Sequence, residues 1–164
     1  MKIRKLISIG LAILLAGFLL IQLIPFGHAH DNPPVISEPN WDSPQTREIA
    51  QRACFDCHSN DTDWPWYSNV APVSWLVQHD VDEGRAVLNF SEWGQGGDSE
   101  ELDELYEVVA EGEMPMANYL VTHPEARLTD AERLALADGL LVTARQSPMT
   151  GSHDSGESRE EDDD

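Results

Sequence analysis

The chain contains only two cysteines, and both lie in the pentapeptide Cys54-Phe55-Asp56-Cys57-His58. Two thiols at this spacing, followed at once by a histidine, form the attachment pattern of a c-type haem. The thiols bond the two vinyl groups on one edge of the macrocycle, and the imidazole reaches the iron as an axial ligand. We therefore expect Cys54 and Cys57 to hold one covalent haem c, with His58 as its proximal ligand.

Other roles for the two cysteines fit the sequence less well. A redox dithiol of the thioredoxin type would lie near a βαβ pattern, which the sequence does not show. Structural zinc would require His79 and His123 to converge on the thiols, because there is no further cysteine. A disulfide across two intervening residues would close too small a loop to add much stability.

A methionine is expected as the second axial ligand of the iron. Met114 lies in Gly112-Glu113-Met114-Pro115, where a helix should end and a loop can direct a thioether at the haem. Met116 follows two residues later and has the same chemistry. His79 and His123 are further candidates, although a histidine beside carboxylates is more typical of a solvated surface. We predict Met114 as the ligand, with the other three residues as alternatives.

The N-terminal residues predict a membrane segment. Lys2, Arg4 and Lys5 precede an apolar run over residues 6–26. A helix of this length spans about 32 Å, close to the thickness of a hydrocarbon core, whereas the apolar part of a cleaved signal peptide has about 7 to 15 residues. We expect residues 1–27 to be an uncleaved single-pass anchor in the cytoplasmic membrane, with a cleaved signal as the alternative. The positive start would leave the rest of the chain on the periplasmic or extracytoplasmic side.

The middle of the chain, residues 43–148, is predicted to be one all-α domain. Apolar residues recur there at helical spacing, and no segment shows the sustained alternation of a strand. Residues 28–42 are rich in proline, which favours a stiff linker that lifts the domain off the membrane. Residues 149–164 are mostly Gly, Ser, Asp and Glu, a composition typical of a disordered tail. We expect about four helices around one haem, as in a small cytochrome c.

Two of these helices are expected before the glycine-rich middle of the domain. The first should begin at Ser43 and Pro44 and lead into the cysteines. The second should begin at Pro72 and continue towards Leu88 or Phe90. The apolar side of this second helix is expected to carry Trp75, Leu76 and Val81.

Two further helices are expected after the loop glycines Gly94, Gly96 and Gly97. Ser99 can cap a third helix that ends near Gly112. Thr129-Asp130-Ala131-Glu132 is a capping box and predicts the start of a fourth helix. The apolar residues of the third helix are Leu102, Leu105, Tyr106 and Val109, and those of the fourth are Leu134, Ala137, Leu141 and Ala144.

The chain is strongly acidic, with a formal net charge of −20 and no lysine after Lys5. Such a surface would repel nucleic acid, so a nucleic-acid partner is not expected. An acidic face can attract a redox protein that has a basic docking face. The same acidity is equally typical of solubility or of adaptation to high salt.

Four stretches carry a likeness to a known group of proteins. They are CFDCHSNDTDWPWYSNVAPVSW at 54–75, EGRAVLNFSEW at 83–93, GEMP at 112–115 and HPEARL at 123–128. With them, the region from Pro44 to Leu141 resembles the haem-binding domain family of bacterial membrane-anchored proteins. The resemblance implies a small, mostly helical, exported domain with a c-type haem.

The resemblance also implies roles for individual residues. It implies haem attachment at Cys54 and Cys57 and proximal ligation by His58. Met114 occupies the position of the family's methionine, and Met116 stands where a second proline would be expected.

The leading functional hypothesis is a one-electron carrier, because ligation by His and Met fills both axial positions and leaves no open site for a substrate. Membrane or periplasmic redox proteins would be its partners. The alternative is a peroxidase-like haem enzyme or a haem-based redox or gas sensor, in which the distal position is open or the methionine is easily displaced. His79 and His123 would then be the candidates for a distal acid-base residue.

Overall fold

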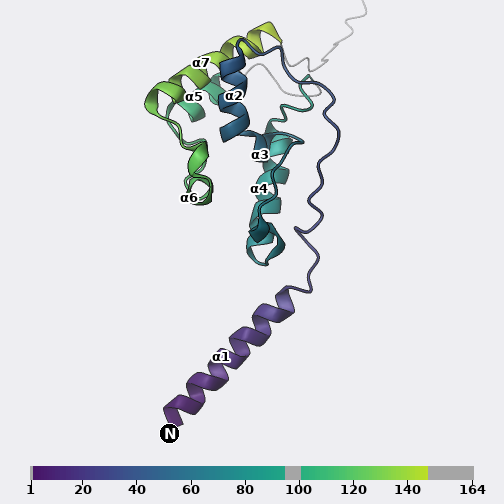
Figure 1. The fold of residues 1–164 in the computed structure, drawn as a ribbon, viewed down its shortest axis with the longest axis vertical. Coiled ribbons are helices and arrows are strands. Elements are labelled where there is room, and N and C mark those ends of the chain that lie inside the picture. Colours follow the sequence, from purple (N-terminus) through teal and green to yellow (C-terminus); the bar gives the residue numbers. More distant parts are fainter. Residues whose placement is uncertain (1, 95–100, 148–164) are drawn as a thin grey trace, which may run out of the picture.

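Seven α-helices and two short 3-10 turns make up the regular structure of the residues that the computed structural model describes, which are 2–94 and 101–147. These ranges contain no strand, so the all-α class predicted from the sequence is confirmed. Figure 1 shows α1 extending away from a domain that the other helices build. The helices are α1 Lys2–Ile21, α2 Pro44–Ala53, α3 Phe55–His58, α4 Val73–Val87, α5 Glu101–Ala110, α6 Tyr119–Thr122 and α7 Asp130–Gln146, and the turns are η1 Trp66–Asn69 and η2 Pro124–Ala126.

The helices begin where the capping signals of the sequence place them. The hydroxyl of Ser43 accepts a hydrogen bond from the Thr46 N–H at 3.1 Å, which caps α2. Thr129 and Glu132 exchange the two hydrogen bonds of a capping box at the start of α7. Helix α4 begins directly after Pro72. Several predicted features lie outside the described residues: Gly96, Gly97, the cap at Ser99, the side chain of Leu102 and the tail over 149–164.

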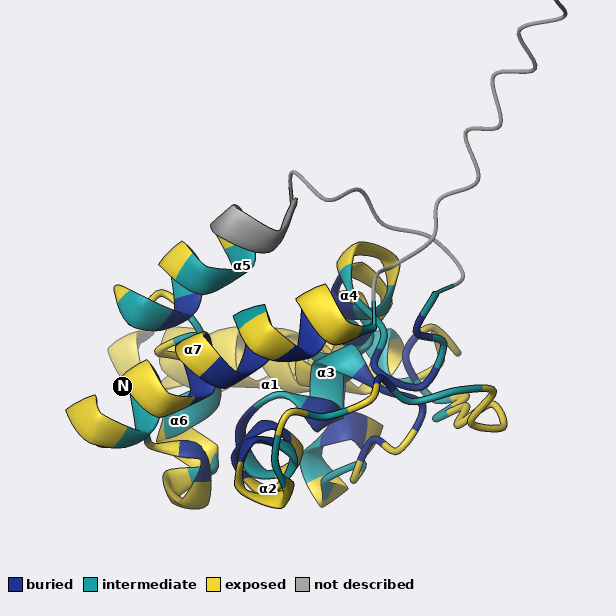
Figure 2. Ribbon diagram, turned by 90° about the horizontal axis from the view of Figure 1, so that it is seen from above, coloured by how far each residue is buried: buried dark blue, intermediate teal, exposed yellow. Residues whose placement is uncertain are grey.

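The core of the domain is a cluster of aromatic and aliphatic side chains between α2, α5 and α7. The Phe90 ring lies between those of Phe55 and Trp93, with centroids 5.5 Å and 6.0 Å away. A Cβ at Gly139 of α7 would overlap the side chain of Thr46, so α2 and α7 pack closely. Figure 2 shows the buried positions that run along α7. Helix α7 therefore packs against both α2 and α5 and joins these two helices.

Two of the predicted apolar positions are exposed. Leu134 of α7 is 50% exposed and Leu76 of α4 is 51% exposed. Helix α7 buries Ala137 and Ala144 as predicted, and it also buries Leu136 and Leu140, because it packs against both α2 and α5 and its buried side is wider than the predicted one. On α4, Val81 is buried as predicted, whereas Trp75 is only half-buried.

The proline-rich segment before α2 is extended and lies against the domain. Its backbone pairs with the chain after α4, where Ile36 and Ser37 donate to the Ser91 carbonyl. The amide of Asn60 donates to the Pro34 carbonyl at 3.2 Å. The segment therefore forms part of the folded domain, because its backbone finds hydrogen-bond partners along the domain's surface.

Candidate functional site

The two cysteines and His58 are placed by a sharp break in the helix that precedes them. Helix α2 ends at Ala53, Cys54 has φ −126°, and the rest of the motif forms the four-residue helix α3. Helix α4 lies directly against this motif. A Cβ at Gly84 would be 2.5 Å from the Cys57 carbonyl oxygen, so only glycine permits the approach. The α3 and α4 backbones therefore touch beside the thiols.

A cavity of about 350 Å³ opens on the same side of this motif. Helices α3 and α4 form one wall, and α5 with the chain that follows it forms the opposite wall. Within the described residues, no extensive packing joins α4 to α5, so the space between them is left open. Apolar residues that line it include Val87, Leu105, Val108 and Leu140. The cavity is thus a largely apolar space beside two thiols and an imidazole.

His58 is held in one orientation by the chain after α4. Its Nδ1 lies 3.1 Å from the Leu88 carbonyl oxygen. A carbonyl only accepts, so Nδ1 carries the hydrogen and Nε2 keeps a free lone pair. Burial lowers the pKa of His58 and outweighs its backbone hydrogen bonds, which favours the neutral imidazole. A neutral, oriented imidazole is the form that binds a metal.

The two thiols are free and protonated in this environment. Burial is the main cause that raises the pKa of Cys54 to about 12 and the pKa of Cys57 to about 11. A dithiol of the thioredoxin type needs a thiolate near neutral pH, and these surroundings disfavour it. In the described part of the chain, no three His, Cys, Asp or Glu side chains converge as a metal-binding group. The thiols and His58 are therefore not arranged as a chelate.

Met114 and Met116 both line the cavity, together with the residues of the cysteine motif. Gly112, with φ +79°, follows the end of α5 and allows the chain to turn back. Its N–H donates to the Val109 carbonyl at 3.1 Å, and the Met114 N–H donates to the Val108 carbonyl at 3.0 Å. This loop brings both thioethers into the cavity. The predicted stop of the third helix near Gly112 is confirmed, while the choice between the two sulfurs stays a prediction.

His79 and His123 do not line the cavity. His79 is exposed on α4, as predicted for a solvated residue. His123 is instead half-buried in a polar network, where its ring stacks on Tyr119 with centroids 3.9 Å apart. The expectation of a solvated His123 is therefore wrong. Both residues are poorly placed to serve as the sixth ligand.

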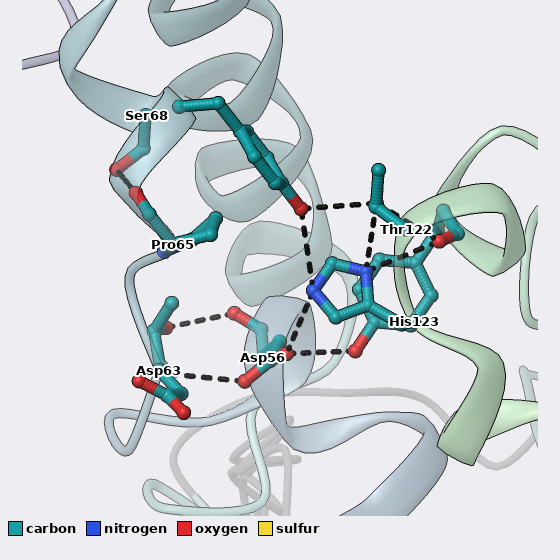
Figure 3. A network of polar contacts seen from close by, with 9 residues as sticks. Asp56, Asp63, Pro65, Ser68, Thr122 and His123 are labelled. Carbon is teal, nitrogen blue, oxygen red and sulfur yellow. Dashed lines mark hydrogen bonds and ion pairs between the residues drawn. The ribbon is translucent and has the colours of Figure 1, made fainter.

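The network around His123 ties α6 to the cysteine motif (Figure 3). The Tyr119 hydroxyl donates to the Asp56 carboxylate at 2.7 Å, and His123 Nε2 lies 3.9 Å from the same oxygen. The Tyr67 hydroxyl donates to Thr122 at 3.0 Å. Asp56 lies between the two cysteines and Tyr119 lines the cavity, so this network connects the two walls. The sequence analysis missed it.

Carboxylates occupy part of the cavity wall. Asp80 and Glu83 of α4 and Glu104 of α5 line it, and none of the described lining residues is Lys or Arg. Burial raises the pKa of Asp80, against a smaller opposing effect of His79. A group bound in the cavity therefore has acidic neighbours.

One of three comparisons with known proteins found a match. The family model described as haem-binding domain matches residues 16–141. No curated protein and no solved structure matches the chain. The matched range covers the cysteine motif, all of α4 and α5, and the methionine loop. Because it spans well over half of the sequence, the chain belongs to the haem-binding domain family.

Proposed function

We propose that this haem-binding protein is a membrane-anchored c-type cytochrome that carries one covalent haem and transfers single electrons. The observation that carries the proposal is the cavity, which gathers Cys54, Cys57, His58 and Met114 from elements far apart in the sequence. Two thiols, an imidazole, a thioether and apolar walls are the donor set that a c-type haem needs. The residues present therefore fit the cofactor.

Each of these residues has a separate task in the proposed site. The thiols of Cys54 and Cys57 form thioethers that keep the cofactor from leaving. The Leu88 carbonyl holds the Nδ1–H of His58, which leaves the Nε2 lone pair free, and His58 would bind the haem iron through this atom. Met114 would supply a thioether as the second protein ligand, a soft donor that favours the reduced state. When bound, the haem supplies the iron that accepts and releases the electron.

The positions of the two candidate histidines favour the electron carrier over a haem enzyme that uses a distal histidine. A peroxidase-like enzyme needs a distal acid-base group, and His79 and His123 were the sequence's candidates for that task. Neither lines the cavity. With both axial positions filled, carbon monoxide should bind the ferrous protein poorly at neutral pH. Ready binding would support the enzyme or sensor alternative instead.

Helix α1 supports the proposed membrane anchoring. Residues Ile3–Ile21 have a mean hydropathy of 2.1, and none of this window is buried against the domain. We propose that α1 spans the cytoplasmic membrane and that the haem domain lies on its periplasmic or extracytoplasmic side. Partners would be redox proteins of the membrane or periplasm that present a basic docking face to this acidic domain.

A haem stain of denaturing gels tests the central claim. The mature protein should keep its colour on the gel and after extraction with acidified acetone, because thioethers survive both treatments. Cys54→Ser together with Cys57→Ser should lose the stain while the chain is still detected with antibody. Release of all haem from the wild-type protein by the extraction would overturn covalent attachment.

A further inference from the structure

An uncharged surface of the domain lies next to the end of α1. Residues 64–79 contain no Asp, Glu, Lys or Arg, although the whole chain has a net charge of −20. The segment comprises η1, the turn after it and the first part of α4. Three of its apolar side chains are exposed: Trp66 by 78%, Val73 by 42% and Leu76 by 51%. Val73 and Leu76 lie three residues apart on α4, and η1, which carries Trp66, packs against α4, so the three side chains come from neighbouring elements.

The same segment is joined to the chain that leaves α1. The Gln22 side chain donates to the Ala71 carbonyl at 2.9 Å and accepts from the Ala71 N–H at 2.9 Å. Gly27 has φ +78°, and a Cβ there would overlap a backbone carbonyl of α4. Only glycine allows this approach without strain. In Figure 1 the first turn of α4 accordingly points towards the end of α1.

We propose that Trp66, Val73 and Leu76 form a membrane-contact surface that lies in the interface of the bilayer spanned by α1. The inference rests on the proposed anchoring of α1. The occupant is lipid because the surface continues the apolar chain of the anchor, where Leu23 and Phe26 are also exposed. Tryptophan favours the interface, since its ring is apolar and its indole N–H can bond to headgroups.

The distribution of charge supports this orientation of the domain. Along the sequence, Asp63 and Asp80 are the first carboxylates on either side of the uncharged segment. A carboxylate loses hydration when it enters a membrane, and anionic headgroups would also repel it. A domain as acidic as this one could rest on a bilayer only through a surface from which charge is absent. Residues 64–79 provide it beside the anchor.

The contact would set the height of the haem above the membrane. Leu76 and the cavity residues Asp80 and Val87 follow one another along α4. A helix rises about 1.5 Å per residue. Along the α4 axis, Asp80 is therefore about 6 Å beyond Leu76, and Val87 is about 16 Å beyond it. The haem of the domain would then lie close to membrane redox partners without a flexible linker between them.

Spin labels test the contact in the haem-loaded, full-length protein in phosphatidylcholine vesicles. Nitroxides are placed singly at Trp66→Cys, Val73→Cys, Leu14→Cys and Leu134→Cys, and the wild type serves as the blank for labelling of native cysteines. Positions 14, 66 and 73 should collide more often with oxygen, which enters lipid, than with a water-soluble nickel chelate. Position 134, which is exposed on α7, should show the opposite preference.

The four positions separate the two claims. If labels 66 and 73 resemble label 134 while label 14 is in lipid, the membrane-contact surface is refuted and the anchor stands. If label 14 is also in water, α1 does not span the bilayer and both claims fail. Oxygen preference at positions 14, 66 and 73 together supports the inference.

Discussion

Gly84→Ala is expected to damage the haem site specifically, because the new methyl group would meet backbone that cannot move aside. The added Cβ would lie 2.5 Å from the Cys57 carbonyl oxygen and 3.0 Å from the Cys57 Cβ. Overpacking of this kind costs about 1–3 kcal/mol, and a backbone neighbour places the cost at the upper end. Alanine in a helix interior returns about 1 kcal/mol relative to glycine. The net loss in the free energy of unfolding should therefore be about 1–2 kcal/mol.

The matched control is Gly139→Ala, which also adds a methyl group inside a helix. Its Cβ would overlap the side chain of Thr46, between α2 and α7 and away from the cavity. Both variants should lower the melting temperature of the full-length holoprotein, by several degrees for each kcal/mol. Only Gly84→Ala should also shift the haem absorption bands and lower the yield of covalent haem, because it separates α3 from α4 beside Cys57.

Two assays are needed. Circular dichroism monitors thermal unfolding, and the haem absorption spectrum is recorded at room temperature. A Gly84→Ala protein as stable as the wild type, with an unchanged spectrum, would show that α3 and α4 do not approach as described. Equal spectral changes in both variants would show that the effect follows from lost stability alone.

Three further outcomes are expected. Met114→Ala should abolish the weak near-infrared iron–sulfur band and lower the reduction potential, whereas Met116→Ala should do neither; the reverse result identifies Met116 as the ligand. Tyr119→Phe removes the 2.7 Å hydrogen bond to Asp56 and should lower the free energy of unfolding by about 1–3 kcal/mol. A denaturant titration measures this loss, and an unchanged midpoint would show that the hydrogen bond does not stabilise the domain. Electron transfer to a basic acceptor should slow steeply as salt is added, while a flat response would favour acidity as a device for solubility.

The sequence predicted the features of the fold that depend on neighbouring residues. The caps at Ser43 and Thr129 form hydrogen bonds within one turn of chain, so residue type and spacing were sufficient. Which side of a helix is buried depends on what packs against it, and the sequence does not state this. Leu134 and Leu76 were assigned to buried faces for that reason and are exposed.

The same distinction applies to the candidate site. Cys54, Cys57 and His58 were predicted as the haem site because their spacing is itself the chemical signal, and the structure places all three beside one cavity. The hydrogen bond between Asp56 and Tyr119 joins residues 63 positions apart, and no local sequence pattern predicts it. The sequence analysis expected a solvated His123. Its partners come from three separate segments, so the sequence alone could not show that they surround the ring. A polar residue inside the cysteine motif was the signal that would have drawn attention to this network.

Within the described residues, the haem domain has two walls with a cavity between them. Helices α3 and α4 carry His58 on one side, and α5 with its following loop carries Met114 on the other. Direct packing between these walls is sparse. Helix α7 connects them indirectly, through its contacts with α2 and α5. The hydrogen bond between Asp56 and Tyr119 connects them directly. In the proposed cytochrome, a haem bound to His58 and Met114 would fill the apolar space and supply the missing contacts. The cofactor would therefore complete the core of the domain as well as carry the electron.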